Sequence, residues 1–262
     1  MSDLVSILTV LWPVALAAVA AVVLERLAPW RREQRRDLLA WLQIVVLYLS
    51  ALIFTRLTVP LAGVGGAIWG GEQGIGLFHL VEVPLWLAVI VGVLALDVAD
   101  YLRHRLQHSF EGLWRVHRVH HSDEQVDAAT ALKFHPFEVA LTALFGLGTV
   151  LLLGLPVMAV LVHGALVLLF DFWEHANVRT PRAVHALHAV LVTPALHRVH
   201  HSDVEHHYNA NFGIIFSIWD RIFGTYCAPE RVEGEISFGL GAENRLDFRS
   251  IGALLSDPFR KG

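Results

Sequence analysis

The sequence predicts an all-α integral membrane protein, with about three membrane-spanning helices, a helical hairpin and a histidine-rich helical cap on the cytoplasmic side. Three observations lead to this prediction. Of 262 residues, 55% are hydrophobic and 17% are charged, and the mean hydropathy is +0.53, which is too apolar for an ordinary soluble domain. Long stretches without charge alternate with polar ones. Histidines recur three and four residues apart, and the heptapeptide HRVHHSD occurs twice, at 117–123 and 197–203.

Long apolar stretches with few or no charged residues give the positions of the expected helices. Each span must cross about 30 Å of hydrocarbon at about 1.5 Å per residue. The three expected spans are Leu4–Leu24, Leu38–Thr55 and Val83 to about Arg103. The stretch Val139–Phe170 also lacks Asp, Glu, Lys and Arg, but as one straight helix it would overshoot that thickness. Gly154 and Pro156 interrupt it, so we expect a hairpin of two short helices, 137–153 and 156–174.

Basic residues indicate the orientation. A basic cluster lies between the first two expected spans and consists of Arg26, Arg31, Arg32, Arg35 and Arg36. Such clusters stay on the cytoplasmic side. The loop from Pro60 to about Glu82 has no Lys or Arg and is rich in glycine, so we expect an irregular surface loop outside. The histidine-rich segments then face the cytoplasm, with the bacterial inner membrane as the expected location.

Composition and motif content divide the chain and exclude several function classes. We expect N-terminal membrane helices with the Gly-rich loop at 1–82, a catalytic domain at 83–227 and a short irregular C-terminal tail at 228–262. The net charge of −4 gives no reason to expect nucleic-acid binding. Cys227 is the only cysteine, which excludes an intrachain disulfide framework and a thiolate-bound iron–sulfur cluster.

The histidine spacing predicts a metal site. Residues three and four apart share a face of a helix, so each histidine group can present two or three imidazoles to one point. The groups are His104 and His108; His117, His120 and His121; and His197, His200 and His201. These eight donors exceed the about four ligands that one structural zinc ion takes, so two ions are the simpler interpretation. Imidazole binds iron, zinc, copper and nickel, and the ligand type alone does not name the metal.

Two further histidines are candidate ligands beside these groups. His175 follows the expected hairpin and is a candidate ninth ligand, and His135, in KFHPFE, is a candidate tenth. The alternative for His135 is a residue at a helix N-terminus, held by Pro136. His188 and His207 are near the expected cap but outside the repeated pattern, and neither is assigned a role.

Two aspartates near the end of the third span are candidate catalytic helpers. Asp100 lies four residues before His104, on the same helical face, where it could accept a ring N–H and fix the tautomer. Asp97 is assigned a similar supporting role. The alternative is that both aspartates only mark the edge of the membrane.

Six segments together resemble the fatty acid hydroxylase and sterol desaturase superfamily of membrane di-iron enzymes. They are DVADYLRHRLQH, LWRVHRVHHSD, KFHPFE, FWEHAN, TPALHRVHHSD and NANFGIIFSIWDRIFGTY, between about residues 83 and 227. The resemblance implies ligands at the eight boxed histidines, with His175 matching an extra histidine before the last box. Phe212 stands where the family usually has tyrosine, whereas Asn211 remains available as a hydrogen-bonding group beside the ligands.

The same resemblance implies an activity and its partners. The expected reaction is O2-dependent hydroxylation or desaturation of a lipid at two iron ions, for which zinc can substitute in a purified sample. Hydroxylation is preferred because the HRLQH and HRVHH spacings resemble the hydroxylase branch. No segment resembles a fused electron-transfer domain, so we expect a separate donor, a ferredoxin or a b-type cytochrome with its reductase. Sterol, fatty acyl, alkyl ether and carotenoid substrates are all compatible.

Three other function classes are compatible with parts of this pattern. A metal transporter would place its ligands in broken helices at the bilayer midplane, whereas these histidines follow the spans. A catalytically inactive lipid-binding relative need not keep a full ligand set, and here all eight boxed positions are histidine. A zinc hydrolase rarely needs eight histidines.

Overall fold

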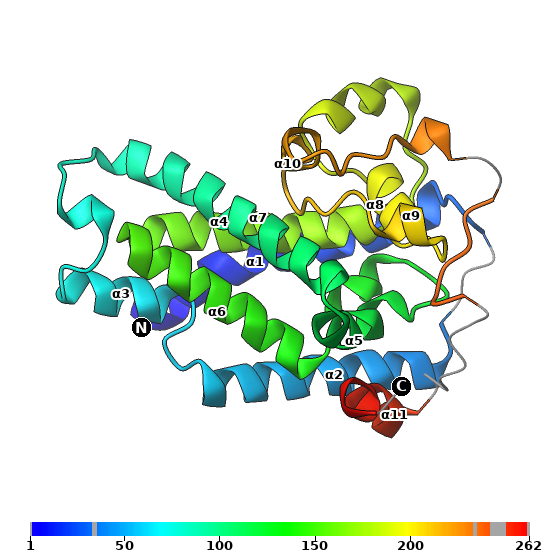
Figure 1. Ribbon diagram of the computed structural model, residues 1–262, viewed down its shortest axis with the longest axis horizontal. Coiled ribbons are helices and arrows are strands. Elements are labelled where there is room, and N and C mark those ends of the chain that lie inside the picture. The colour runs from blue at the N-terminus through cyan, green and yellow to red at the C-terminus, as the bar shows by residue number, and fades with distance from the viewer. Residues whose placement is uncertain (1, 33–35, 233–234, 242–249, 261–262) are drawn as a thin grey trace. The chain divides into compact units, whose positions relative to one another are not determined.

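The computed structural model describes residues 2–32, 36–232, 235–241 and 250–260, with the side chains of the first helix described from Ala15 onward. All regular elements in these residues are helices, and β-structure is limited to isolated bridges (Figure 1). The expected all-α class is therefore confirmed. Arg35 of the basic cluster, and residues 233–234, 242–249 and 261–262 of the expected C-terminal tail, lie outside the described residues.

The long helices lie at the expected apolar stretches, and shorter helices lie between and after them. In chain order they are α1 (Ser2–Leu27), α2 (Leu38–Thr58), α3 (Val64–Glu72), α4 (Leu85–Ser109), α5 (Glu111–His121), α6 (Pro136–Leu153), α7 (Val157–His175), α8 (Pro194–His200), α9 (Glu205–Tyr208), α10 (Ile218–Ile222) and α11 (Ile251–Ser256). Among the described residues, α2, α4, α6 and α7 are long and apolar enough to cross a membrane. This confirms an apolar helix at each of those expected positions, and α1 covers the stretch expected as the first span.

The chain forms two compact units, each assembled from three separate stretches. The first unit contains residues 1–35, 124–131 and 165–239, and the second contains residues 36–123, 132–164 and 240–262. Most of the long helices belong to the second unit. In it, α2, α3 and α4 all pack against α6, and α4 also packs against α5.

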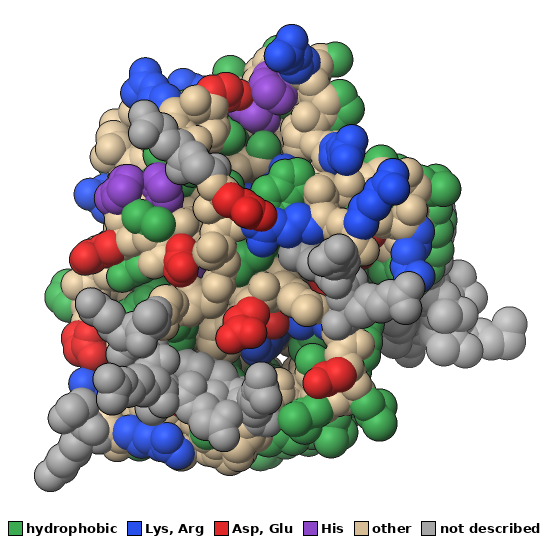
Figure 2. All heavy atoms as spheres, turned by 90° about the vertical axis from the view of Figure 1, so that its right-hand side faces the viewer, with side chains coloured by type: hydrophobic (Ala, Val, Ile, Leu, Met, Phe, Trp, Pro, Cys, Tyr) green, Lys and Arg blue, Asp and Glu red, His purple; other side chains and the backbone are tan. Residues whose placement is uncertain are grey.

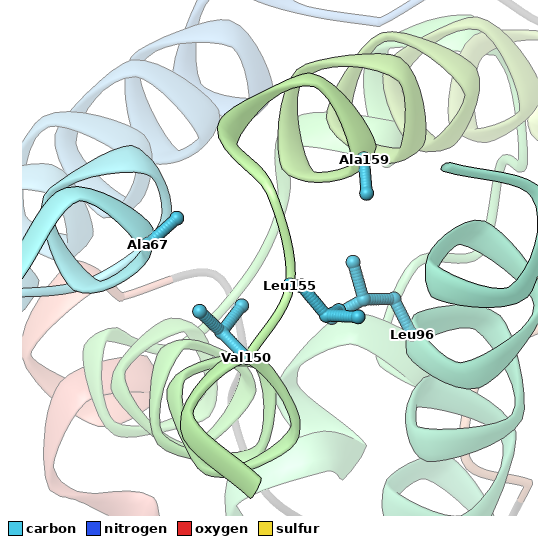
Figure 3. Close-up of a cluster of buried hydrophobic side chains, with 5 residues drawn as sticks. All are labelled: Ala67, Leu96, Val150, Leu155 and Ala159. Atoms are coloured by element: carbon cyan, nitrogen blue, oxygen red, sulfur yellow. The ribbon is translucent and has the colours of Figure 1, made fainter. Parts of the chain in front are cut away.

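The interruption between α6 and α7 is part of the core of the second unit. Gly154 ends α6 in the left-handed conformation, with φ of 68°, which glycine adopts without a steric penalty. Leu155 follows and is only 2% exposed; it lies beside Leu96 of α4 and Ala159 of α7 (Figure 3). Burial of such a leucine contributes about 1.5–3 kcal/mol, so the break stabilises the fold as well as separating the two helices.

The Gly-rich loop expected between Pro60 and Glu82 contains a helix, α3, and the expectation of an irregular loop there was wrong. Gly66 and Gly70 lie four residues apart on the face that meets α6. A Cβ atom at Gly66 would stand 2.4 Å from Leu147 Cδ1, and one at Gly70 would stand 2.9 Å from Leu151 Cδ2. Small residues therefore let the two helices approach closely, as in membrane helix pairs. This packing outweighs the low helix propensity of glycine.

The C-terminal tail was also expected to be irregular, and its described part contains α11. Ser250 caps this helix by accepting a hydrogen bond from the backbone N–H of Ala253. Leu254 is fully buried with Leu47 and Val119, from α2 and α5. The tail is thus an integral part of the second unit.

Asp257, just after α11, fixes the tail to α5 through a paired contact. Both carboxylate oxygens accept hydrogen bonds from the guanidinium of Arg118, at 2.5 and 2.8 Å, and Asp257 is 1% exposed. Removing one partner of a buried charge pair leaves the other uncompensated and costs about 3–5 kcal/mol. We expect Asp257→Ala to lower the free energy of unfolding by about 3 kcal/mol, measured by chemical denaturation in a mild detergent.

The control for this prediction is Glu111→Ala, which changes a carboxylate on α5, the helix that carries Arg118. Glu111 accepts a hydrogen bond from Arg115 at 2.8 Å, but its side chain is 67% exposed. An exposed pair at this spacing contributes about 0.3–0.5 kcal/mol. Equal effects of the two substitutions would contradict the role assigned to Asp257.

Two carboxylates hold the backbone of non-helical segments in the first unit. Asp220 of α10 is 1% exposed and accepts hydrogen bonds from the backbone N–H groups of Phe212 and Gly213 and from the Thr225 hydroxyl. Glu25 of α1 accepts from the backbone N–H groups of Ala128 and Asn177. These carboxylates satisfy backbone groups that no helix pairs. The face of the molecule drawn in Figure 2 carries charged and histidine side chains among hydrophobic ones.

Candidate metal centres

Four histidines converge in the second unit. His104 and His108 lie on the last turns of α4, and His117 and His121 lie on α5, which packs against α4. The Nε2 atom of His117 is 3.0 Å from Nε2 of His104 and 3.2 Å from Nε2 of His121. One ring nitrogen of each of the four residues lies within 4.8 Å of the others. We call these four residues the α4–α5 cluster.

The middle histidine of the HxxHH box does not join this cluster. His120 donates from Nδ1 to the backbone carbonyl of Lys133 at 3.2 Å, and its ring stacks on Phe134. His117 and His121 are four residues apart and share a face, but His120 is one residue, about 100° of helical rotation, from His121. The expectation that all three rings of the box point the same way was therefore wrong.

Three histidines converge in the first unit. His175 ends α7, His197 lies on α8, and His201 directly follows α8. Their Nε2 atoms are separated by 2.9 Å (His175 to His197), 3.2 Å (His175 to His201) and 3.1 Å (His197 to His201). All three are at most 2% exposed. We call these residues the α7–α8 cluster.

His200 repeats in the first unit what His120 does in the second. Its Nδ1 donates to the backbone carbonyl of Ala210 at 2.8 Å, and the side chain is completely buried. Burial lowers the pKa of His200 from 6.5 to about 3, opposed by the hydrogen bond to Ala210 and reinforced by the charge of His175. The ring is therefore neutral at pH 7, and Nδ1 carries its proton. A neutral imidazole with a fixed Nδ1–H presents Nε2 as a lone-pair donor.

Each cluster has a buried carboxylate beside the first histidine of its box. In the second unit, His117 donates from Nδ1 to Oε1 of Glu138 at 2.5 Å. In the first unit, Oε2 of Glu174 lies 3.6 Å from Nδ1 of His197. Carboxylates in this position orient a ligand ring and raise its basicity. Neither glutamate was assigned a role from the sequence. For Glu138, the available signal was a glutamate three residues after His135, in the first turn of an expected helix.

The ring nitrogens fit a metal ion. His117 and His175 both donate from Nδ1, to Glu138 and to the backbone carbonyl of Asp171, so in the neutral ring each turns an Nε2 lone pair toward its cluster. Lone pairs that face one another at about 3 Å repel unless a proton or a cation lies between them. Metal–nitrogen bonds of about 2.0–2.1 Å would separate the ligands of a tetrahedral or octahedral ion by about 2.9–3.4 Å. The two distances from His117 in the α4–α5 cluster and all three distances in the α7–α8 cluster fall in this range.

His135, a candidate ligand from the sequence, is occupied elsewhere. Its Nδ1 accepts a hydrogen bond from the backbone N–H of Phe137 at 3.2 Å, and its Nε2 donates to the backbone carbonyl of Leu255 at 3.2 Å. Burial lowers its pKa below the ordinary value. His135 is thus the N-cap of α6, and the alternative of a residue at a helix N-terminus describes it better than a ligand.

Asp100 and Asp97, the two aspartates expected to support the ligands, are both buried in α4. Asp100 contacts Arg103 at 3.4 Å and His163 at 3.5 Å, and no contact with His104 is seen. Asp97 is fully buried within α4. The expected role of Asp100 in fixing the His104 tautomer therefore does not fit the structure, because the carboxylate points to a different neighbour.

Asn211 supports α8 without touching a histidine. Its side-chain amide donates to the carbonyls of Leu196 and Cys227, and its oxygen accepts from the backbone N–H of Cys227. Its φ of 57° is left-handed, which asparagine tolerates better than most residues. Asn211 thus fixes the turn that places α8, rather than acting beside the ligands.

Comparison with known proteins assigns the chain to a family. The family model described as fatty acid hydroxylase matches residues 89–225, which is more than half of the chain and includes both histidine clusters. The chain belongs to the fatty acid hydroxylase family. The resemblance stated from the motifs is confirmed.

Several curated relatives of this family member are named as lipid-oxidising enzymes. The ornithine lipid hydroxylase OlsE of Rhizobium tropici is 32% identical over 180 residues, 68% of this chain and 53% of that protein. The alkylglycerol monooxygenase of Danio rerio is 35% identical over 168 residues, 62% of this chain and 35% of that protein. The human cholesterol 25-hydroxylase is 27% identical over 143 residues, 52% of this chain and 50% of that protein.

These matches extend over only about one third to one half of each relative's length. No solved structure gives a significant match. Together with its four long apolar helices, membership of the fatty acid hydroxylase family makes the chain an integral membrane protein.

In this member of the fatty acid hydroxylase family, Trp114 also lies beside the α4–α5 cluster. The histidine spacing gave no indication of it. It lies on α5, three residues before His117, and its ring centroid is 4.9 Å from that of His108 and 5.3 Å from that of His121. Its large apolar ring covers one side of the α4–α5 cluster. Such a side chain limits the access of water to the ring nitrogens.

The carboxylate of Glu138 gives a direct test of the α4–α5 cluster. Glu138→Gln keeps the size of the side chain and removes the charge that accepts from His117. We expect metal bound at this cluster to dissociate about 10- to 100-fold more readily, measured by competition with a chromophoric chelator. Glu111→Gln, an exposed change on α5, is the control. Unchanged metal affinity in Glu138→Gln would show that the carboxylate does not support a ligand.

Proposed function

We propose that this chain is a membrane-embedded di-iron oxidoreductase that hydroxylates a lipid, using O2 and electrons from a separate donor protein. The observation that carries the proposal is the presence of two buried histidine clusters, each with Nε2 atoms about 3 Å apart. Family membership and relatives named as hydroxylases and a monooxygenase support the same activity.

The residues that would hold the metal ions follow from the two clusters. One ion would be held by His104, His108, His117 and His121, and the other by His175, His197 and His201. His120 and His200 add Nε2 donors whose tautomers are fixed by backbone carbonyls. Neutral imidazoles leave the charge of an iron ion uncompensated, which suits iron centres that react with O2.

The reaction balances with an external reductant. Two iron ions, when bound, would supply the oxidising power for insertion of one oxygen atom of O2 into a C–H bond. The other oxygen atom leaves as water, and this requires two electrons and two protons. The donor proposed is a ferredoxin or a b-type cytochrome with its reductase. The histidine clusters would face the cytoplasm, where such a donor is available, and the bacterial inner membrane is the proposed location.

The chain's own groups perform binding and orientation. Glu138 holds the His117 ring, and the carbonyl of Asp171 holds the His175 ring, so each keeps one nitrogen directed to its cluster. Trp114 covers the rings of His108 and His121. Because these rings are already held in place, they need not reorient when the metal ion or substrate binds. This preorganisation lowers the activation free energy.

The substrate is proposed to be a lipid with a long apolar group and a polar head. The relatives are named for an ornithine lipid, an alkylglycerol and cholesterol, which share this chemistry. Large apolar side chains are exposed along α2 and α4, for example Ile53, Leu85 and Trp86. A protein with such a surface meets its lipid substrate directly in the bilayer, which acts as its solvent.

The proposal is tested by metal analysis and lipidomics of the same protein. The full chain is purified in mild detergent and analysed for iron and zinc, and the lipids of cells that express it are compared with those of cells without it. We expect about two iron ions per chain and a lipid that gains one oxygen atom, labelled when 18O2 is supplied. Loss of two hydrogens instead would change the reaction to desaturation. Iron-loaded protein that leaves every lipid unchanged, with donor present, would contradict the proposal.

A further inference from the structure

The first unit contains a third group of metal-ligating side chains, built from residues outside both histidine clusters. His185 and His188 lie on the 3-10 helix η3 (Arg182–Ala189), and Glu230 lies on the 3-10 helix η4 (Pro229–Arg231). One ligand atom of each residue lies within 4.8 Å of the others. We propose that His185, His188 and Glu230 form a binding site for a divalent transition-metal ion, for which Zn2+ is the best fit.

The local structure brings the two histidines together. Residues three apart are eclipsed on a 3-10 helix, whereas they are offset on an α-helix. The rings of His185 and His188 are accordingly stacked, with centroids 4.8 Å apart and planes inclined by 22°. Both rings turn Nδ1 toward the same carboxylate oxygen, Oε1 of Glu230, at 3.0 Å from His185 and 3.8 Å from His188.

His188 is the observation that points to a ligand. Its side chain is 4% exposed, yet its Nε2 has no hydrogen-bond partner, and its Nδ1 is too far from Glu230 for a hydrogen bond. No hydrogen bond to Glu230 therefore holds the buried ring, and a cation between the two rings and the carboxylate would hold it through the Nδ1 lone pair. Burial, with the charge of His185 next in size, lowers the pKa of His188, so the ring is neutral and able to bind a metal.

The donor set and its surroundings define the ion. Two imidazoles and one carboxylate, with a fourth position open to water, are ligands that zinc accepts. The His185 side chain is 37% exposed and that of Glu230 is 53% exposed, so solvent can reach the site. Arg221 and Arg198 lie near enough to His188 to lower its pKa, and their positive charge limits the affinity for a dication. We therefore expect a dissociation constant on the order of micromolar.

A metal ion here would connect two parts of the first unit. The helix η3 precedes α8, and η4 packs against α8, which carries His197. The ion would link η3 to η4 and stabilise the native state by mass action. The site does not depend on the proposed oxygenase activity, because none of its residues belongs to either cluster.

The test compares zinc binding by the wild-type chain and by two variants. Full-length protein with a tag that lacks histidine is titrated with Zn2+ in mild detergent, by calorimetry or competition with a chromophoric chelator. Glu230→Gln changes an exposed side chain and should leave the fold intact, and His188→Ala removes the buried ring. We expect the wild type to bind one Zn2+ more than either variant, or to bind it at least about tenfold more tightly.

Further measurements separate this site from the clusters. Both variants keep all the residues of the clusters, so their iron content should equal that of the wild type. With both clusters already loaded with iron, added Zn2+ should raise the melting temperature of the wild type and not that of Glu230→Gln. His206→Ala, a change of an exposed histidine, is the control and should behave as the wild type. Zinc binding that is identical in the wild type and Glu230→Gln would overturn the proposal and leave His185 and Glu230 as an ion pair only.

Discussion

Replacement of His117 by alanine should reduce hydroxylated product by at least about 100-fold and lower the metal content by about one ion per chain. His117 contributes to the α4–α5 cluster in two ways. Its Nε2 lies 3.0 Å from His104 and 3.2 Å from His121, and its Nδ1 is held by Glu138. Alanine therefore removes a central donor and leaves the buried Glu138 carboxylate without this partner. Iron analysis and quantification of the lipid product measure the two effects separately.

Two comparisons make this prediction specific. His197→Ala should produce the same losses through the α7–α8 cluster, because His197 occupies the matching position in the second copy of the heptapeptide. His206→Ala changes an exposed histidine outside both clusters and should leave metal content and product unchanged. Full iron content together with full product in His117→Ala would rule out its role as a ligand.

Gly76→Ala is expected to produce the largest loss of stability of any single methyl addition in the second unit. Gly76 has φ of 107° and ψ of 165°, a region that is essentially restricted to glycine. A Cβ atom there would stand 2.1 Å from the backbone nitrogen of Gly154 and 2.7 Å from the carbonyl oxygen of Leu151. Backbone atoms cannot rotate away as a flexible side chain can. We expect a loss of more than about 4 kcal/mol, observed as a lower melting temperature and poor yield in detergent.

Gly74→Ala is the matched control two residues earlier. Gly74 has a positive φ of 64°, but nothing lies within 4 Å of the position of an added Cβ. Its substitution should cost only the about 1–2 kcal/mol of a left-handed residue. The difference between the two variants therefore measures the close approach of Gly76 to the turn between α6 and α7. Similar losses of stability in both variants would show that the positive φ, rather than the close contact with Gly154 and Leu151, determines the effect.

The long helices and most of the ligand pattern follow from local sequence. A helix in hydrocarbon must pair all its backbone groups, so a charge-free stretch of sufficient length is a strong signal. Spacing of four residues correctly paired His117 with His121, and Gly154 with Pro156 marked the break correctly. Spacing of three residues wrongly placed His120 in one cluster with His117 and His121. Its ring is held instead by a hydrogen bond from Nδ1 to the backbone carbonyl of Lys133.

The two copies of HRVHHSD show why other features could not be predicted. Arg118 in the first copy binds the carboxylate of Asp257, whereas Arg198 in the second donates to the carbonyl of Val178. Asp123 in the first copy accepts two hydrogen bonds from Arg36, at 3.0 and 2.7 Å. These partners come from distant parts of the chain, so identical local sequence has different surroundings. The helix α3 has the same explanation, because its glycines pack against α6, which is distant in the sequence.

The construction of each compact unit from three separate stretches has a consequence for biosynthesis. The second unit includes residues 240–262, so during synthesis Asp257 emerges well over a hundred residues after Arg118 and can neutralise it only then. Until then, Arg118 of α5 lacks the carboxylate with which it pairs in the folded protein. The segment 89–225, if expressed alone, would lack stretches of both units. Assembly of the second unit should therefore finish only after residues 240–262 have been made, and chains terminated before them should be removed by proteases.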